Sequence, residues 1–343
     1  MTAINTYAFL NAKVRAMRSN LLSATFYKSM IDAYDQQDLY QLLVQSRFRN
    51  RIEQLGYHDA PAIERQLLLE EIDQLNVIRK YAKDPVKSFI ASLMERYDNE
   101  KVKNLLRCWH HKESGQFDPI REKIVANIPV DLILSAPNLE TIGTLLSPTP
   151  FGKSILSAVM DYQAHKTLFP VELALDRDTF QRLVDVSSNL NRKDMQIVRR
   201  LLGIEIDIKN LGWIGRFKSY YELSSADIMT RLLPQGYRLS MDHIRKILAG
   251  GSLQEALIEV LKGSQLKIPA ELDDTLALDT MERFLYEILL YEAKRAFSDF
   301  PFSIGAVLGY FYLMRIETKN IRTLFQAKEY SLSAEQTESL LVY

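Results

Sequence analysis

One short segment of the sequence contains residues of the kind that bind nucleotides. Gly152-Lys153-Ser154 matches the end of a phosphate-binding P-loop, in which glycine-rich main chain wraps closely around the phosphates. The first glycine of that motif would fall on Ser147, and Pro148 and Pro150 remove two main-chain N–H donors that a phosphate cradle needs. The segment therefore predicts a turn and the start of a helix rather than a nucleotide site.

Two further clusters contain metal-ligating types without the spacing that a metal needs. Of Cys108, His110 and His111, only the first and last share a helix face, whereas a zinc site needs three or four protein ligands. Asp273-Asp274 is similar to an aspartate-rich magnesium motif, but the position of the third carboxylate is Ala277. We therefore expect no catalytic residues, no cofactor and no metal.

A third set of polar residues recurs at a nearly constant spacing, which is the mark of an internal repeat. Lys101, Asn210 and Asn320 are 109 and 110 residues apart. An acidic residue lies three positions before each of them, and an aliphatic residue lies one position after it. The acidic residues are Asp98, Asp207 and Glu317, and the aliphatic ones are Val102, Leu211 and Ile321. Arg107 and Arg216 follow the first two by six positions, where the third repeat has Gln326.

The shared helix face of each acid and its partner also carries aliphatic residues, which predicts that these polar side chains are partly buried. Buried polar groups are normally hydrogen-bonded, so one interpretation is a brace within each repeat. The repeats themselves predict three similar helical domains at residues 1–128, 129–236 and 237–343. Their boundaries fall at Asn127–Pro129 and Leu233–Gly236, where proline and glycine stop helices.

The elements that position these residues are predicted to be helices, and the fold class to be all-α. Apolar residues recur at three- and four-residue spacings over Ile63–Ile78, Val86–Met94, Phe180–Leu202, Ile244–Leu261 and Met281–Ala296. Leu173-Ala174-Leu175-Asp176 recurs as Leu276-Ala277-Leu278-Asp279, and each copy is predicted to open a long helix with its Asp as the cap. Only Ile204–Ile208 alternates like a strand, and we interpret it as a helix connection.

Composition excludes several classes of protein. The 343 residues carry 43 basic and 43 acidic side chains, so no net field attracts nucleic acid. A single cysteine excludes an intrachain disulfide and fits a reducing compartment. The longest uncharged apolar run, Phe300–Met314, is shorter than the roughly 20 residues of a membrane span, and predicts a buried helix. The first residues lack the pattern of an export signal, so we expect a cytoplasmic protein.

The whole chain also resembles a known family: the C subunit of archaeal and bacterial V-type (A-type) rotary ATPases, called the d subunit in the eukaryotic vacuolar enzyme. Three segments carry the resemblance. They are Tyr7-Ala8-Phe9-Leu10-Asn11-Ala12-Lys13-Val14-Arg15-Ala16-Met17 with Leu21-Leu22, the repeated Asp-x-x-Asn-Leu motif running on to Arg216-Phe217-Lys218, and Leu233-Pro234-Gln235-Gly236. Lys101 departs from the motif, because the other repeats have asparagine there.

The resemblance implies a funnel of three helical domains around a pseudo-threefold axis, with no active site. Such a protein is a socket between the membrane rotor ring of proteolipids and the central shaft, peripheral to the membrane, and passes torque between them in ATP synthesis or ion transport. The residues that would then either meet the shaft or brace the repeats are Asp98, Arg107, Asp207, Asn210, Arg216, Glu317 and Asn320. The alternative from a different class is a cytosolic helical-repeat adaptor that binds other proteins, although known arrays of that kind use repeats of about 33 to 47 residues.

Overall fold

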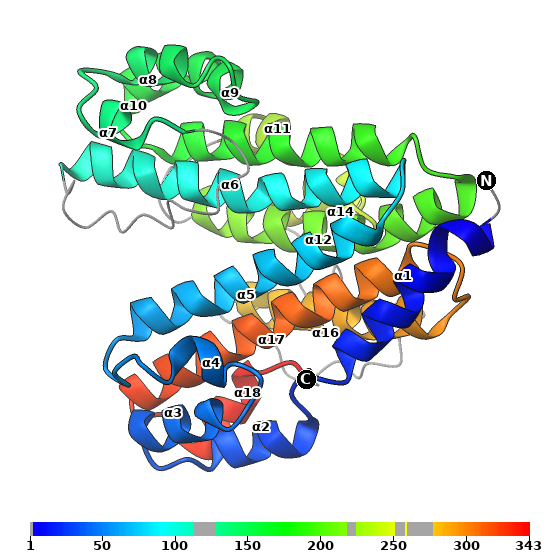
Figure 1. Cartoon of the computed structure of the whole chain (residues 1–343). Coiled ribbons are helices and arrows are strands. Elements are labelled where there is room, and N and C mark those ends of the chain that lie inside the picture. Colours follow the sequence, from blue (N-terminus) through cyan, green and yellow to red (C-terminus); the bar gives the residue numbers. More distant parts are fainter. Residues whose placement is uncertain (1–2, 113–127, 218–223, 251–257, 259–276) are drawn as a thin grey trace. The chain divides into compact units, whose positions relative to one another are not determined.

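The structure is a computed structural model that describes residues 3–112, 128–217, 224–250, 258 and 277–343. Every regular element in these described ranges is a helix, which confirms the predicted all-α fold class (Figure 1). The chain divides into two compact units, one made of residues 1–82 and 191–343 and the other of residues 83–190. No helix in the described ranges is both long and apolar enough to cross a bilayer.

The larger unit contains most of the long helices. Its helices are α1 (Ala3–Arg18), α2 (Ala24–Ile31), α3 (Gln36–Val44), α4 (Arg49–Ile52), α5 (Ala60–Tyr81), α12 (Arg192–Arg216), α13 (Ser225–Arg231), α14 (Met241–Leu248), α16 (Ala277–Ser298), α17 (Gly305–Glu329) and α18 (Ala334–Leu340). The smaller unit contains α6 (Val86–His111), α7 (Val130–Leu134), α8 (Leu139–Leu145), α9 (Phe151–Ser157), α10 (Val159–His165) and α11 (Phe169–Ser187).

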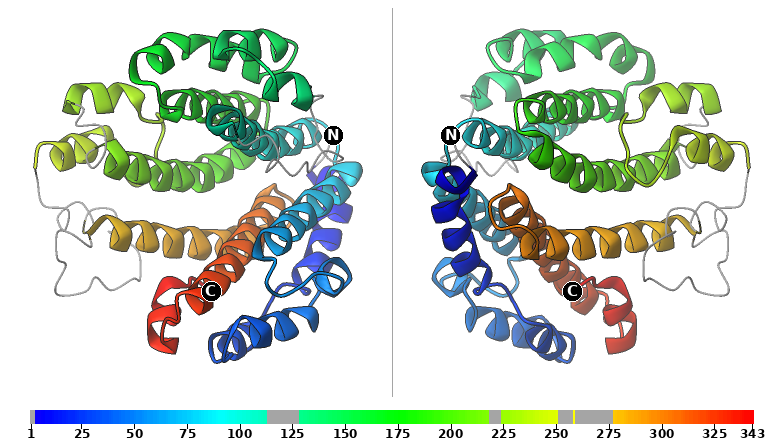
Figure 2. Two further views of the ribbon diagram at one scale, coloured as in Figure 1. Left: turned by 90° about the vertical axis from the view of Figure 1, so that its left-hand side faces the viewer. Right: turned by 90° about the vertical axis from the view of Figure 1, so that its right-hand side faces the viewer.

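Helix α17 is the central element of the larger unit, and most of its residues are buried. It packs against α1, α3, α5, α12, α16 and α18 (Figure 1 and Figure 2). Its closest neighbour is α16, and two glycines allow the approach. A Cβ atom at Gly305 or Gly309 would come within 2.5 or 2.6 Å of a carbonyl oxygen of α16. The two helices therefore meet with main chain against main chain, as small residues at a helix contact permit.

The smaller unit is built on α6 and α11, which pack side by side, with the short helices α7 to α10 completing its core. Between the two long helices, the carboxylate of Asp176 accepts hydrogen bonds from Asn99 Nδ2 at 2.7 Å and Lys103 Nζ at 2.9 Å. All three side chains are buried. A buried charge without a partner is costly, so these hydrogen bonds fix the position of α6 along α11.

The helix contacts follow one rule within the units. The long helices form consecutive pairs in the sequence: α5 with α6, α11 with α12, and α16 with α17. In each case the second helix of a pair packs against the first helix of the next pair: α6 on α11, α12 on α16, and α17 on α5. The short helices obey a matching rule, since α7 packs on α8, α13 on α14, and α18 on α2. In both series the last contact joins the C-terminal repeat to the N-terminal one.

Several predicted boundaries were wrong. The pattern over Phe180–Leu202 is not one helix, because the chain leaves α11 after Ser187 and the side chain of Asn191 caps α12 by accepting from Lys193 and Asp194 N–H. Ile204–Ile208 is not a connection but lies inside α12. Its residues alternate because this part of α12 is buried on every side and its acids are hydrogen-bonded, as described below.

The predicted helix caps at the two Leu-Ala-Leu-Asp copies also differ from the structure. Helix α11 begins at Phe169, seven residues before Asp176, with Pro170 in its first turn. Asp176 therefore lies inside the helix and contacts α6 instead. In the second copy, α16 is already helical at Ala277, and the side chain of Asp279 is outside the described residues. Asp273-Asp274 and Ser252–Leu257 are outside them as well. The helix expected over Phe300–Met314 begins only at Gly305, after Pro301.

Candidate functional site

The repeated polar residues lie at comparable places on the second long helix of each pair. Asp98 and Lys101 are on α6, Asp207 and Asn210 on α12, and Glu317 and Asn320 on α17. We call these six residues the anchors. None of them is more than 6% exposed. Their function must therefore be read from the groups that they hold inside the protein.

The anchors of the second repeat hold the segment that joins α13 to α14. Asn210 pairs with both main-chain groups of Leu233: its Nδ2 donates to the carbonyl at 2.9 Å and its Oδ1 accepts from the N–H at 2.8 Å. Asp207 Oδ2 accepts from the N–H groups of Tyr237 at 3.1 Å and Arg238 at 2.6 Å. We call residues 232–240 with their two anchors the second joint.

The carboxyl group of Asp207 is fully buried beneath this segment. Burial raises its pKa to about 7, although the main-chain N–H groups of residues 237–239 oppose the shift by stabilising the charged form. The segment can lie this close because residue 236 is glycine. A Cβ atom at Gly236 would be only 2.0 Å from Asp207 Oδ1.

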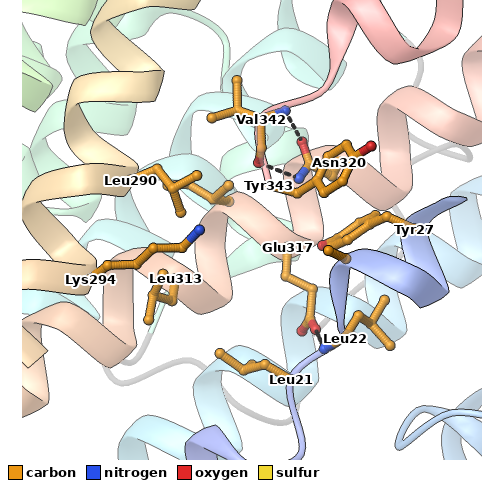
Figure 3. Close-up of a pocket in the computed structure, with 12 residues that line it drawn as sticks. Leu21, Leu22, Tyr27, Leu290, Lys294, Leu313, Glu317, Asn320, Val342 and Tyr343 are labelled. Carbon is orange, nitrogen blue, oxygen red and sulfur yellow. Dashed lines mark hydrogen bonds between the residues drawn. The ribbon is translucent and has the colours of Figure 1, made fainter. Parts of the chain in front are cut away.

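The anchors of the third repeat hold two segments from opposite ends of the sequence. Asn320 pairs with both main-chain groups of Val342, donating from Nδ2 to the carbonyl at 2.7 Å and accepting from the N–H at 3.2 Å. Glu317 accepts from the N–H of Leu22 at 2.6 Å and is paired with the guanidinium of Arg47. Burial raises the pKa of Glu317, and Arg47 opposes this shift. We call residues 20–23 and 341–343 with their two anchors the third joint (Figure 3).

Arg47 belongs to a chain of alternating charges on α4 and α5 and the segment before them. Its Nη1 lies 3.3 Å from Glu70 Oε1, and Glu70 is also paired with Arg51, whose Nη2 lies 2.5 Å from Asp73 Oδ2. The guanidinium of Arg47 stacks over the ring of Phe48, 4.4 Å from its centroid. Glu317 is therefore linked to the surface through a continuous series of ion pairs.

The anchors of the first repeat differ because lysine replaces asparagine. Lys101 is buried beside Asp98, and burial lowers the pKa of Lys101 while Asp98 opposes the shift. Arg107 donates from Nε to Glu172 Oε1 of α11 at 2.6 Å, and its side chain is 45% exposed. Arg216 is the last residue of α12, and its side chain is outside the described residues.

In the segments that contain nucleotide- or metal-binding residue types, the side chains contact other groups of the protein. Gly152 is buried in the first turn of α9, where a Cβ atom would lie 2.6 Å from the carbonyl carbon of Leu146. The hydroxyl of Ser154 donates to Asp178 Oδ2 at 2.9 Å. His110 Nδ1 lies 3.0 Å from the hydroxyl of Tyr162. Over the described ranges, no three histidine, cysteine or acidic side chains come together as metal ligands.

Sequence reasoning missed three other buried polar contacts in the larger unit. The hydroxyl of Tyr7 donates to Asp194 Oδ2 at 2.5 Å, and the other oxygen of this carboxylate accepts from the N–H of Ile304 at 2.8 Å. The hydroxyl of Tyr312 donates to Glu205 at 3.0 Å. Glu292 of α16 lies among three arginines, with Arg200 Nε at 3.1 Å, Arg238 Nη2 at 3.7 Å and Arg295 Nη1 at 3.8 Å. The only sequence cue was Tyr7, which opens the family-like N-terminal segment.

The fold and the anchors define an all-helical scaffold protein, in which repeated buried polar side chains hold main chain of the protein itself. The comparison with known families gives the class a name. A family model described as ATP synthase (C/AC39) subunit matches residues 10–340, so the chain belongs to that family.

Individual relatives cover almost the entire chain. The C subunit of the A-type ATP synthase from Methanocaldococcus jannaschii is 22% identical over 345 residues, which cover 98% of this chain and 86% of the relative. The protein of the same name from Haloferax volcanii is 24% identical, with 97% of each chain covered. That of Archaeoglobus fulgidus is 25% identical, with 98% of this chain and 96% of the relative covered.

Proposed function

We propose that this chain is a non-catalytic central-stalk component of a V-type (A-type) rotary ATPase or ATP synthase. It is a socket that links the proteolipid rotor ring to the central shaft and transmits torque between ATP chemistry and ion movement. It lies on the cytoplasmic side, peripheral to the membrane, and is held there by the complex. The observation that carries the proposal is membership of the ATP synthase subunit family over residues 10–340.

The cyclic order of helix contacts supports three similar domains about a pseudo-threefold axis. Each long helix that carries anchors packs on the first long helix of the following repeat, and the third repeat contacts the first in the same way through α17 and α5. This order is what a closed arrangement of three domains, residues 1–128, 129–236 and 237–343, requires.

The anchors fit a part that must stay rigid under torque. Asn210 and Asn320 make the same pair of main-chain hydrogen bonds in two repeats, and Asp207 and Glu317 each accept main-chain N–H groups. In our proposal Asp98, Asp207, Asn210, Glu317 and Asn320 are braces within the scaffold. Arg107, with its exposed guanidinium, and Arg216 remain candidates for contact with the shaft.

The test is to rebuild the ATPase with and without this chain and to measure ATP hydrolysis and ion uptake by the same vesicles. Without the chain, the soluble head should still hydrolyse ATP, while ATP-driven ion uptake should be lost because chemistry and transport have no mechanical link. Adding the chain back should restore uptake, and its interfaces should be durable ones that bury on the order of 2,000 Å². Undiminished uptake per ATP without the chain would refute the coupling role.

A further inference from the structure

Cationic side chains from three helices gather around the end of α16. Arg15 of α1 donates from Nη2 to the carbonyl of Phe297 at 3.1 Å, and its guanidinium group lies 5.1 Å from the centroid of the Phe297 ring. The guanidinium group of Arg18 lies over the same ring at 4.4 Å. Lys193 of α12 lies over the ring of Phe300, with its Nζ 3.7 Å from the centroid. Two aromatic rings, three residues apart in the chain, therefore hold three cations.

Two further arginines lie near the preceding turn of α16 and share one carboxylate. Arg200 Nε is 3.1 Å and Arg295 Nη1 is 3.8 Å from the same atom, Glu292 Oε2. One carboxylate cannot neutralise two guanidinium groups that share one of its oxygen atoms. We call the five cations the cationic cluster: Arg15, Arg18, Lys193, Arg200 and Arg295.

Acidic side chains do not balance the cationic cluster at the surface. The three cations at the aromatic rings contact an amide oxygen, a carbonyl oxygen and the rings themselves, and in the described ranges none of them pairs with a carboxylate. Of the acidic residues beside the cluster in the sequence, Asp194 and Glu292 are buried and Asp299 is exposed. The charge that faces solvent is therefore mainly positive. The exposed members of the cluster are Arg15, Lys193 and Arg295.

The chemistry of the cluster favours carboxylates as its ligand. Four of its five members are arginines, whose planar guanidinium groups can bind a carboxylate through two parallel hydrogen bonds. Main-chain and ring contacts already hold Arg15 and Arg18, so these side chains lose little conformational entropy when an anion binds. A carboxylate ligand also relieves the repulsion between neighbouring cations, which the isolated chain must bear.

Two other kinds of anionic partner fit the cluster less well. The chain has 43 basic and 43 acidic residues, so it lacks the net positive field of a nucleic-acid-binding protein. A segment that binds a lipid surface buries an apolar face among the lipids. Here Phe297 is only 2% exposed, and Phe300, at 43%, has Lys193 over its ring. The cluster therefore lacks an apolar face that could enter a bilayer.

We propose that the cationic cluster is a docking surface for an acidic segment of another subunit of the same ATPase. Aspartate or glutamate side chains of that segment pair with the exposed cations around the end of α16. That the partner belongs to the ATPase rests on the proposed function. The recognition of carboxylates rests on the cluster itself and can be measured without the complex.

The first test uses the isolated full-length chain and two fluorescein-labelled peptides, octaglutamate and octaserine, with binding followed by anisotropy. Octaglutamate should bind saturably, with an affinity that falls as salt is raised, whereas octaserine should not bind. Arg15→Gln combined with Arg18→Gln should weaken octaglutamate binding by at least about fivefold. Arg15→Lys combined with Arg18→Lys keeps both charges and should weaken it by a smaller factor.

Lys87→Gln combined with Lys153→Gln is the matched control, because both lysines are exposed on helices of the smaller unit. It removes the same number of charges and should leave the affinity for octaglutamate within about twofold. Two results would overturn the docking surface. One is no saturable binding of octaglutamate, and the other is binding that the two glutamine substitutions in the cluster weaken no more than the control does, in protein that is folded by circular dichroism.

Vesicles distinguish the lipid alternative. Vesicles of phosphatidylcholine with one quarter phosphatidylglycerol should not bind the chain at a salt concentration where octaglutamate does. Vesicle binding that depends on Arg15 and Arg18, without octaglutamate binding, would overturn the proposal, because the anion recognised would then be a lipid phosphate.

A second measurement identifies the partner in the assembled ATPase. A carbodiimide joins a lysine amine directly to a carboxylate that it touches, and Lys193 is the lysine of the cluster. Mass spectrometry of the coupled complex should find Lys193 linked to an aspartate or glutamate of another subunit, with Lys87 as the control site. If Lys193 forms no such link in a complex that pumps ions, the docking proposal is wrong although the coupling role stands.

Discussion

The side-chain amide of Asn320 satisfies both the N–H and the carbonyl of Val342, with heavy-atom distances of 3.2 and 2.7 Å. Asn210 does the same for Leu233 in the preceding repeat, at 2.8 and 2.9 Å. In both cases the clamped segment follows a short helix. The side-chain amide makes the two hydrogen bonds that a neighbouring β-strand would otherwise make to this segment. An isolated segment of main chain can therefore be buried against a helix without a β-sheet.

Replacing Asn320 by leucine should destabilise the protein by about 2–4 kcal/mol, because two buried main-chain groups lose their partners at once. The measurement is the midpoint of urea unfolding. Asn50→Leu is the matched control, since Asn50 is exposed on α4 and should shift stability by less than about 0.5 kcal/mol. Equal effects of the two substitutions would show that the clamp at Val342 contributes nothing.

Gly236→Ala tests the close approach at the second joint. The new methyl group would be placed 2.0 Å from Asp207 Oδ1, so either the carboxylate or the segment over it must move. We expect a loss of about 2–4 kcal/mol. Gly212→Ala in α12 is the control, because its Cβ atom would meet nothing within 4 Å, and helix propensity there favours alanine by up to about 1 kcal/mol. A tolerated alanine at 236 would contradict the geometry.

The buried carboxyl of Asp207 should make stability depend on pH. Its pKa is raised from the ordinary 3.8 to about 7, so between these values the folded protein binds more protons at this group than the unfolded chain does. Stability from this group is therefore greatest below pH 4, falls as pH rises towards 7, and is constant above it. The upper limit of the fall is about 4 kcal/mol.

Asp207→Asn removes this titration and keeps a side-chain oxygen that can accept from Arg238. Unfolding by urea at a series of pH values from 5 to 8 should show a shallower fall in the variant than in the parent chain. Some slope will remain, because burial also raises the pKa of Glu317. If the stability of the parent chain falls no more steeply over this range than that of the variant, Asp207 is ionised throughout.

The repeat and the alignment of its copies could be predicted from the sequence. Residues three positions apart share a face in any helix, so the same pair of residue types recurs at the same spacing. Asp207 with Asn210 and Glu317 with Asn320 do occupy comparable positions on α12 and α17. Their partners could not be predicted in the same way. Leu233 and Val342 follow the anchors by 23 and 22 residues, but they contribute main-chain groups, which leave no mark on residue type. Arg47 lies 270 residues from Glu317, beyond any local pattern.

Local signals also misled where tertiary contacts overrode them. Asp176 has the spacing of a helix cap, yet it lies inside α11 because Asn99 and Lys103 of α6 provide it with buried partners. The alternation over Ile204–Ile208 looked unlike a helix because α12 has no solvent-facing side there. Glu205 accepts from the hydroxyl of Tyr312, and Asp207 Oδ2 accepts from main-chain N–H groups. A hydrophobicity pattern assigns charged residues to the solvent-exposed face of a helix, so it cannot predict acids that are buried.

The pair of Arg47 and Glu317 allows the sharpest test of how the third joint is held. Glu317 is 3% exposed, and the side chain of Arg47 is 11% exposed. Arg47→Met removes the countercharge and leaves a buried carboxylate, which should cost about 3–5 kcal/mol at neutral pH. Because the unpaired acid can take up a proton, this loss should shrink as pH is lowered towards 5.

Glu317→Gln in the same chain should recover part of the loss, since the amide is neutral and its oxygen can still accept from Leu22 N–H. A double-mutant cycle of Arg47→Met and Glu317→Gln, measured by urea unfolding, gives the coupling between the two side chains. Arg49→Met with Glu53→Gln is the control cycle, because that ion pair on the surface, at 3.1 Å, should couple by less than about 1 kcal/mol. A coupling for the buried pair no larger than for the surface pair would mean that Glu317 is already neutral beside Arg47, and that the ion pair adds nothing to its hydrogen bond with Leu22 N–H.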